Sequence, residues 1–271
     1  MAEARHVTGL GRWLAIAAVL ASCWAPTEDP AHVPAPAQAP TPSREPATPT
    51  LAATRVRAEP RDAAAMVVPR ASVTAQTRTR YAGSRSDDRV ALSFDDGPTP
   101  QATRRVLQVL RLHDARATFF MLGEQVQRHP ELAAEVARAG HELGNHGWSH
   151  RSWRSLFPSQ LRAELDDTAA AIVAATGVQP RLARPPFGRF PASAEQLVHA
   201  RGDDLVLWSV DSGDSAGADA DTIAATVVER ARAGDIVLLH DRDGRTVRAL
   251  PAILAGLRRK QLRVVPVSEL F

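Results

Sequence analysis

The chain of 271 residues has a single cysteine, Cys23, and a single lysine among its 33 basic residues. One cysteine excludes a disulfide framework and any metal site built from several thiolates. Long apolar runs are also absent: no stretch reaches the roughly 20 apolar residues that a membrane-spanning helix needs, which excludes a polytopic membrane protein. Hydrophobic residues still make up 44% of the chain and charged residues 23%, so a chain disordered throughout is excluded as well.

The chain has little excess charge, and that excess lies near its N-terminus. The formal net charge is +3, and residues 1–80 contain nine arginines against six acidic residues. Residues 81–271 contain 24 basic and 24 acidic residues, so this part is electroneutral. Because affinity for nucleic acids rests largely on neutralising phosphates, we expect no nucleic-acid partner.

The first 23 residues have the pattern of a bacterial secretion signal. Arg5 and Arg12 precede the apolar stretch 13–21, which is too short to span a membrane as a mature helix. The sole cysteine follows directly, in the sequence Leu-Ala-Ser-Cys that ends at Cys23, and this resembles a lipobox. We therefore expect cleavage before Cys23, lipidation of its thiol, and a membrane-anchored lipoprotein of the bacterial cell envelope. A secreted or periplasmic protein is the alternative.

A linker separates this signal from the body of the protein. Residues 24–60 contain nine prolines and nine alanines among scattered polar residues. Such a segment cannot bury enough apolar surface to offset its chain entropy. We assign residues 24–80 to a disordered Pro/Ala-rich linker and residues 81–271 to one catalytic domain.

The body alternates short apolar runs with helical patterns, which indicates an α/β fold. Parallel strands joined by right-handed helical crossovers are the expected consequence. Seven runs have strand character: 90–94, 117–122, 142–145, 181–184, 205–210, 236–239 and 262–267. About seven parallel strands fit a closed or nearly closed (β/α) barrel, with an open doubly wound sheet as the alternative.

Ionisable residues end or follow five of these predicted strands. In βα-barrels, catalytic groups collect just past the carboxyl ends of the strands, so five such positions are expected to converge on one mouth. The residues are Asp95 with Asp96, His146 with His150, Arg184, Asp211 with Asp214, and His240 with Asp241.

The spacing of His146 and His150 is compatible with a metal site. Four residues apart, the two imidazoles share one side of a helical turn, although two surface histidines would show the same spacing. Imidazole and carboxylate ligands suit zinc. The adjacent Asp95 and Asp96 can supply both a ligand and a base, although Asp-Asp-Gly-Pro also favours a turn.

Five motifs together resemble the polysaccharide deacetylases of carbohydrate esterase family 4. They are Ser-Phe-Asp-Asp-Gly-Pro at 93–98, the pair His146 and His150, Arg-Pro-Pro-Phe-Gly at 184–188, Asp-Ser-Gly-Asp at 211–214, and Leu-Leu-His-Asp at 238–241. The resemblance covers about residues 88–271. It implies a distorted (β/α) barrel and hydrolysis of N- or O-acetyl groups on polymeric sugars.

The resemblance also implies the catalytic roles. Asp95 would be the general base, and Arg184 would hold and orient it. His240 would be the general acid, and Asp214 would orient His240 and support its charged form. Hydrolysis of an amide needs both an activated water and a proton for the departing amine, so the two roles are complementary.

The remaining roles concern the metal and the substrate. Asp96, His146 and His150 would bind a divalent metal, most simply Zn²⁺. The backbone N–H of Phe187 would help to stabilise the oxyanion, and Leu238 would line the pocket for the acetyl methyl group.

The chain departs from the family pattern at two positions. Gly147 stands where the family has Ser or Thr, which predicts a less braced loop and weaker metal binding. Ser215 stands where the family has a tryptophan that walls the substrate groove. Trp148, Trp153 or Trp208 would then have to supply the aromatic surface.

The motifs and the N-terminal signal together predict a metal-dependent deacetylase of an extracytoplasmic amino-sugar polymer. Peptidoglycan, a chitin-like polymer and poly-N-acetylglucosamine all fit, and we expect the chain to act as a monomer. An O-acetyl esterase with the same site and an inactive carbohydrate-binding protein are the alternatives. Phosphoryl transfer on an aspartate fits poorly, because it has no use for His146 and His150.

Overall fold

The computed structural model describes residues 78–242 and 244–271. Cys23, the expected signal peptide and most of the expected linker lie outside the described residues. The last three residues of that expected linker, 78–80, are described, and Thr79 and Arg80 belong to the sheet.

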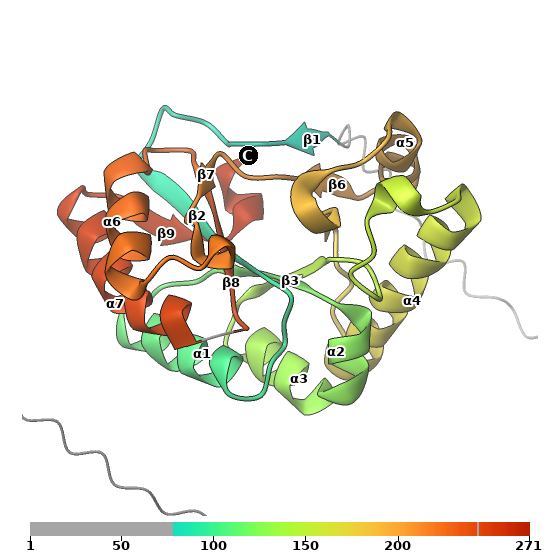
Figure 1. Cartoon of the computed structure of the whole chain (residues 1–271), viewed down its shortest axis with the longest axis horizontal. Helices are drawn as coiled ribbons and strands as arrows, with labels where there is room; N and C mark the ends of the chain where they lie inside the picture. Colours follow the sequence, from blue (N-terminus) through green and yellow to red (C-terminus); the bar gives the residue numbers. More distant parts are fainter. Residues whose placement is uncertain (1–77, 243) are drawn as a thin grey trace, which may run out of the picture. The chain divides into compact units, whose positions relative to one another are not determined.

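One curled sheet forms the centre of the described chain (Figure 1). Its strand order is β1-β6-β5-β4-β3-β2-β8-β7, and β9 pairs with β2. All of these pairs are parallel. The strands are β1 (Thr79–Arg80), β2 (Arg89–Asp95), β3 (Thr118–Met121), β4 (Glu142–Asn145), β5 (Leu182–Ala183), β6 (Asp204–Val206), β7 (Val210–Asp211), β8 (Ile236–His240) and β9 (Arg263–Val265).

Helices cover the outside of this sheet (Figure 1). They are α1 (Ala102–Leu112), α2 (Gly123–Arg128), α3 (Pro130–Arg138), α4 (Pro158–Thr176), α5 (Ala192–Ala200), α6 (Ala220–Arg230) and α7 (Gly244–Arg259). Local sequence sets their ends. α4 begins at Pro158, whose fixed φ suits a first helical position, and stops at Gly177, which has φ 74°. Asp219 caps α6 by accepting a hydrogen bond from the backbone N–H of Thr222 at 2.8 Å.

The predicted parallel barrel is confirmed, but the sheet has nine strands rather than about seven among the described residues. The run 205–210 was expected to be one strand and is two, because β6 pairs with β5 whereas β7 pairs with β8. The chain crosses between these neighbours at Ser209, whose N–H donates to Ile236 O at 3.0 Å.

The other additional strand, β1, comes from the end of the expected linker. The backbone oxygens of Arg80 and of Arg78, which precedes the strand, accept hydrogen bonds from the N–H groups of Leu207 and Leu205, at 2.7 and 3.0 Å. The Thr79 hydroxyl also contacts Glu195 in α5. These long-range contacts have no signature in the local sequence.

Successive side chains of β2 point alternately toward the covering helices and toward the inside of the barrel. Val90, Leu92 and Phe94 pack in a buried cluster with residues of the covering helices, whereas Ala91 packs in a second cluster inside the barrel. Because side chains alternate along a strand, Asp95 shares the inner face with Ala91.

The neighbouring strand β8 follows the same rule. Val237 and Leu239 join the outer cluster, and Ile236 joins the inner one. The parallel register pairs Asp95 with His240, so these two residues end adjacent strands on the same inner face.

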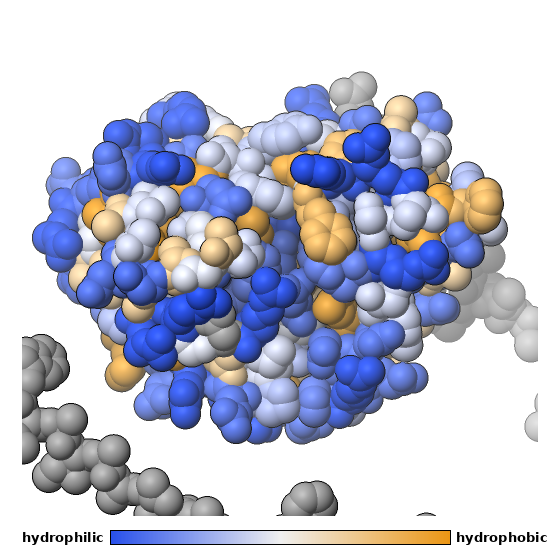
Figure 2. All heavy atoms as spheres, viewed as in Figure 1, coloured by the Kyte–Doolittle hydropathy of each residue, from blue (hydrophilic) through white to orange (hydrophobic). Residues whose placement is uncertain are grey.

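Hydrophilic residues predominate on the face shown in Figure 2, and hydrophobic residues there are scattered. Within the described part of the chain, no helix combines the length and apolar character needed to cross a membrane.

Candidate active site

Two adjacent carboxylates emerge from the end of β2. Asp95 is its last residue, and Asp96 then takes φ 78°, in the left-handed region. This turn points the two side chains in different directions. Gly97 is required next, because a Cβ at this position would lie 2.4 Å from both carboxylate oxygens of Asp241.

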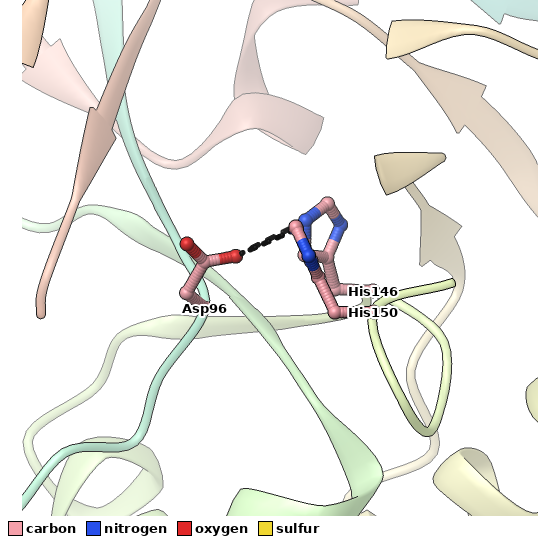
Figure 3. A group of neighbouring side chains, drawn as sticks. All are labelled: Asp96, His146 and His150. Atoms are coloured by element: carbon pink, nitrogen blue, oxygen red, sulfur yellow. Dashed lines mark ion pairs between the residues drawn. The ribbon is translucent and has the colours of Figure 1, made fainter. Parts of the chain in front are cut away.

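Asp96 faces two imidazole rings from the loop that follows β4 (Figure 3). Its Oδ1 lies 3.5 Å from His146 Nε2 and 3.2 Å from His150 Nε2. One potential ligand atom from each of the three residues lies within 4.8 Å of the other two. Asp96 and His146 are buried and His150 is half-buried, so the group opens to solvent on the His150 side.

The state of these groups fits a divalent cation. Asp96 Oδ1 is buried and has no hydrogen-bond partner among the described residues. His146 Nδ1 lies 2.8 Å from the backbone oxygen of Arg184, so this nitrogen carries the proton and Nε2 keeps its lone pair toward Asp96. Burial lowers the pKa of His146, which favours the neutral imidazole that a metal requires.

An exposed aromatic ring lies beside His150. The ring of Phe187 meets that of His150 edge-on, with the centroids 4.7 Å apart. Phe187 is 61% exposed and has φ 62°, a left-handed conformation that is unfavourable for a residue with a Cβ. The structure therefore holds the Phe187 peptide in an unusual orientation at the edge of the histidine pair.

Arg184 lies inside the barrel with no exposed surface. Its Nη1 donates to Asp95 Oδ1 at 2.7 Å and to the Ser93 hydroxyl at 2.8 Å. Nε and Nη2 donate to the backbone oxygens of Val206 and Leu207, at 3.2 and 3.0 Å. The guanidinium therefore holds one oxygen of Asp95, while the other, Oδ2, lies 3.7 Å from His146 Nε2.

Asp214 holds His240 at the end of β8. Its Oδ1 lies 2.8 Å from the ring nitrogen Nδ1 of His240. Its Oδ2 accepts hydrogen bonds from the backbone N–H of His240 at 2.8 Å and from the Thr246 hydroxyl at 2.7 Å. Burial alone would lower the pKa of His240, but the hydrogen bond to Asp214 and the nearby carboxylates raise it above its ordinary value. His240 thus keeps its proton to a higher pH than an ordinary histidine does.

Besides Phe187, the sequence relates Leu238 and Ser215 to the substrate. Leu238 is buried on β8, opposite Ser93 in the register and on the same face as His240. Ser215 is exposed in the 3-10 turn Asp214–Ala216. Among the candidate tryptophans, Trp153 has no exposed surface and cannot face a substrate.

Sequence reasoning missed two charged residues that touch the site. Arg242 Nη1 lies 3.1 Å from Asp96 Oδ2. Glu164, in α4, accepts hydrogen bonds from residues 148 and 149 of the histidine loop. No sequence pattern pointed to Arg242. Glu164 lies three residues after Leu161 and one before Leu165, so it borders the apolar face predicted for this helix, and this position could have pointed to it.

Replacing Arg184 by methionine should destabilise the protein strongly, because the buried carboxylate of Asp95 loses its cationic partner. Breaking a buried pair in this way costs about 3–5 kcal/mol of unfolding free energy. The measurement is urea denaturation. Arg184→Met combined with Asp95→Asn should recover part of the loss. The exposed Arg189→Met is the control, and an equal loss in Arg184→Met and this control would contradict the expectation.

The chain is similar to known carbohydrate-active proteins along most of the described residues. The family model for polysaccharide deacetylase matches residues 82–205. A peptidoglycan-N-acetylglucosamine deacetylase of Bacillus cereus is 39% identical over 187 residues, which cover 67% of this chain and 87% of the relative. A chitooligosaccharide deacetylase of Bradyrhizobium is 35% identical over 204 residues, or 69% of this chain and 91% of the relative.

The fold is also similar to that of a known deacetylase. The crystal structure of a peptidoglycan N-acetylglucosamine deacetylase superposes with a TM-score of 0.69 at 31% identity, covering 72% of this chain and 92% of that one. Sequence similarity, barrel topology and the group formed by Asp96, His146 and His150 lead to one assignment. The chain belongs to the polysaccharide deacetylase family, carbohydrate esterase family 4.

Proposed function

We propose that this protein is a metal-dependent hydrolase that removes N-acetyl groups from an extracytoplasmic amino-sugar polymer. The observation that carries the proposal is the register of β2 and β8, which pairs Asp95 with His240. The group of Asp96, His146 and His150 lies beside Asp95. The residues that we assign as base, acid and cation ligands therefore lie close together at one end of the barrel.

Asp96, His146 and His150 would hold the divalent metal. Two imidazoles and one carboxylate suit zinc and leave positions open, as a catalytic site requires. When bound, the cation supplies a Lewis acid that polarises the acetyl carbonyl and makes water more acidic. His146 is prepared for this role, because its Nδ1–H is already committed to the Arg184 carbonyl.

Asp95 and His240 would handle the protons of the reaction. Asp95 Oδ2 accepts a proton from water, whose oxygen forms a bond to the acetyl carbon. The bond between that carbon and the amide nitrogen then breaks, and the nitrogen receives a proton from His240. With its Nδ1 facing Asp214 at 2.8 Å, His240 presents Nε2 as the donor. The products are acetate and a free amino group on the sugar.

Phe187 and Leu238 would place the acetyl group. The left-handed backbone of Phe187 fixes the direction of its N–H, which we assign to the developing oxyanion. Leu238 lies on the same strand face as His240, two residues before it, and we assign it to the acetyl methyl group. The exposed ring of Phe187 also offers a flat surface for a sugar next to His150.

The proposed substrates are peptidoglycan, a chitin-like polymer or poly-N-acetylglucosamine. The similar proteins named above are peptidoglycan and chitooligosaccharide deacetylases, which supports this class. The location outside the cytoplasm follows from the expected N-terminal signal. The alternative of an inactive binding protein is less favoured, because each expected acid, base and ligand position is filled and in contact with a partner.

The full chain should release acetate from N-acetylglucosamine oligomers or peptidoglycan in the presence of Zn²⁺, and chelation should abolish the release. His240→Ala should lower kcat about 10²–10⁴-fold, the usual contribution of a general acid. The measurement is enzymatic detection of acetate, with the exposed His113→Ala as the matched control. Release from O-acetylated esters alone would identify an esterase instead, and no release from a metal-loaded protein would favour the binding protein.

Asp214→Asn should move the alkaline limb of the pH–rate profile to lower pH. The carboxylate of Asp214 raises the pKa of His240, so His240 keeps its proton to higher pH in the parent protein. Without this charge His240 loses its proton at lower pH. Because the neutral form of His240 cannot act as the general acid, kcat/KM should begin to fall at a lower pH than in the parent protein. The measurement is kcat/KM against pH, with Asp221→Asn, an exposed carboxylate in α6, as the control. An unchanged limb would contradict the role assigned to Asp214.

We further propose that Cys23 carries the lipid anchor predicted from the lipobox pattern. In a bacterial host the mature protein should begin at Cys23 with an acylated N-terminus and should fractionate with membranes. Mass spectrometry of the N-terminal peptide measures this directly, and Cys23→Ser should release the protein. An unmodified thiol at position 23 would refute the anchor.

A further inference from the structure

The loop between His146 and His150 takes an unfavourable path. Gly147 has φ 81° and His150 has φ 59°, both in the left-handed region. His150 is not a glycine, so its conformation is costly and must be held by its surroundings. The orientation of the second imidazole therefore depends on what fixes residues 147–149.

Backbone partners from α2 fix the carbonyl side of this loop. Gly123 N donates to Gly147 O at 3.0 Å, and Glu124 N donates to Trp148 O at 3.2 Å. Asn145 Oδ1 accepts from Gly147 N at 2.9 Å. These contacts leave the N–H groups of residues 148 and 149 to be satisfied.

A single carboxylate accepts both of these N–H groups. Glu164 Oε2 accepts from Trp148 N at 2.6 Å and from Ser149 N at 2.9 Å, while Oε1 accepts from the Ser149 hydroxyl at 2.6 Å. Hydrogen bonds to an ionised carboxylate are stronger than those between neutral groups. Glu164 lies in the second turn of α4, 15 and 16 residues along the chain from the two N–H groups that it accepts.

We propose that Glu164 is a positioning residue for the metal site: its carboxylate holds the loop so that His150 meets Asp96 and His146. This inference rests on the proposed function, because it assumes that the three residues bind a divalent cation. Glu164 is not one of the three residues that would hold the cation. Gly147 lacks the hydroxyl that the family has at this position, and the sequence therefore predicts a less braced loop. The carboxylate of Glu164 lies at this point, because a Cβ on Gly147 would be 3.3 Å from Glu164 Oε2.

Glu164 should act on metal affinity in two ways. Its hydrogen bonds keep His150 in the left-handed conformation before the cation arrives, so binding needs no ordering of the loop. Its negative charge also contacts the loop that carries His146 and His150, and a negative charge there favours uptake of a cation. Outer partners of metal ligands typically contribute about 10- to 100-fold to metal affinity, and this is the expected scale.

The test is Co²⁺ and Zn²⁺ binding by the full metal-free chain, measured by competition with a chromophoric chelator and by the visible absorption of bound Co²⁺. Glu164→Ala should weaken binding about 10- to 100-fold. Glu164→Gln keeps one oxygen acceptor but loses the charge, and should fall between Glu164→Ala and the parent. Asp167→Ala, an exposed carboxylate on the same helix, is the matched control and should bind as the parent does.

Thermal unfolding of the metal-free proteins separates positioning from general stability. Weaker metal binding in Glu164→Gln, at a parental melting temperature, supports the proposal. Parental metal affinity in both Glu164 variants overturns it, even where Glu164→Ala lowers the melting temperature. Metal binding is read without substrate, so a parent protein that binds metal but releases no acetate refutes the proposed function and leaves the role of Glu164 standing. A parent that binds no metal overturns both.

Discussion

Arg184 places a full positive charge inside the barrel, where an unpaired charge would be prohibitively costly. Its partners are Ser93 and Asp95 from β2 and two backbone oxygens, one from the last residue of β6 and one from the residue after it. The guanidinium also stacks on the ring of Phe120, 3.9 Å from its centroid. The peptide oxygen of Arg184 then fixes His146. One residue thus couples the orientation of the proposed base to that of a proposed metal ligand.

The parallel sheet brings the other half of the chemistry to the same place. Parallel strands end at one edge, and their side chains alternate between the helices and the barrel interior. The apolar residues of β2 and β8 that face outward form the core with the helices, which leaves the inner positions for Asp95 and His240. The hydrophobic core and the candidate site therefore lie on opposite faces of the same strands.

Three residues of the site adopt left-handed backbone conformations although none is a glycine: Asp96, His150 and Phe187. Each such residue costs about 1–3 kcal/mol and persists only where the fold holds it. At His150 the visible restraint is the loop that Glu164 and α2 brace. At Asp96 the turn separates two adjacent carboxylates, so that one faces Arg184 and the other faces the histidines. At these three residues the unfavourable backbone conformation sets the direction of a side chain or peptide group in the site.

The sequence by itself determined the α/β class, the alternation of strands and helices, and the residues that end the strands, because hydrophobic period, capping residues and motif order are local properties. It also singled out Asp95, Asp96, His146, His150, Arg184, Asp214 and His240, which the fold brings together. Only the tertiary structure decided that residues 205–210 form two strands and that residues 79–80 join the sheet. The same holds for Glu164 bracing the histidine loop. Each of these depends on contacts between residues distant in the chain, and no local pattern encodes which distant partner supplies a hydrogen bond.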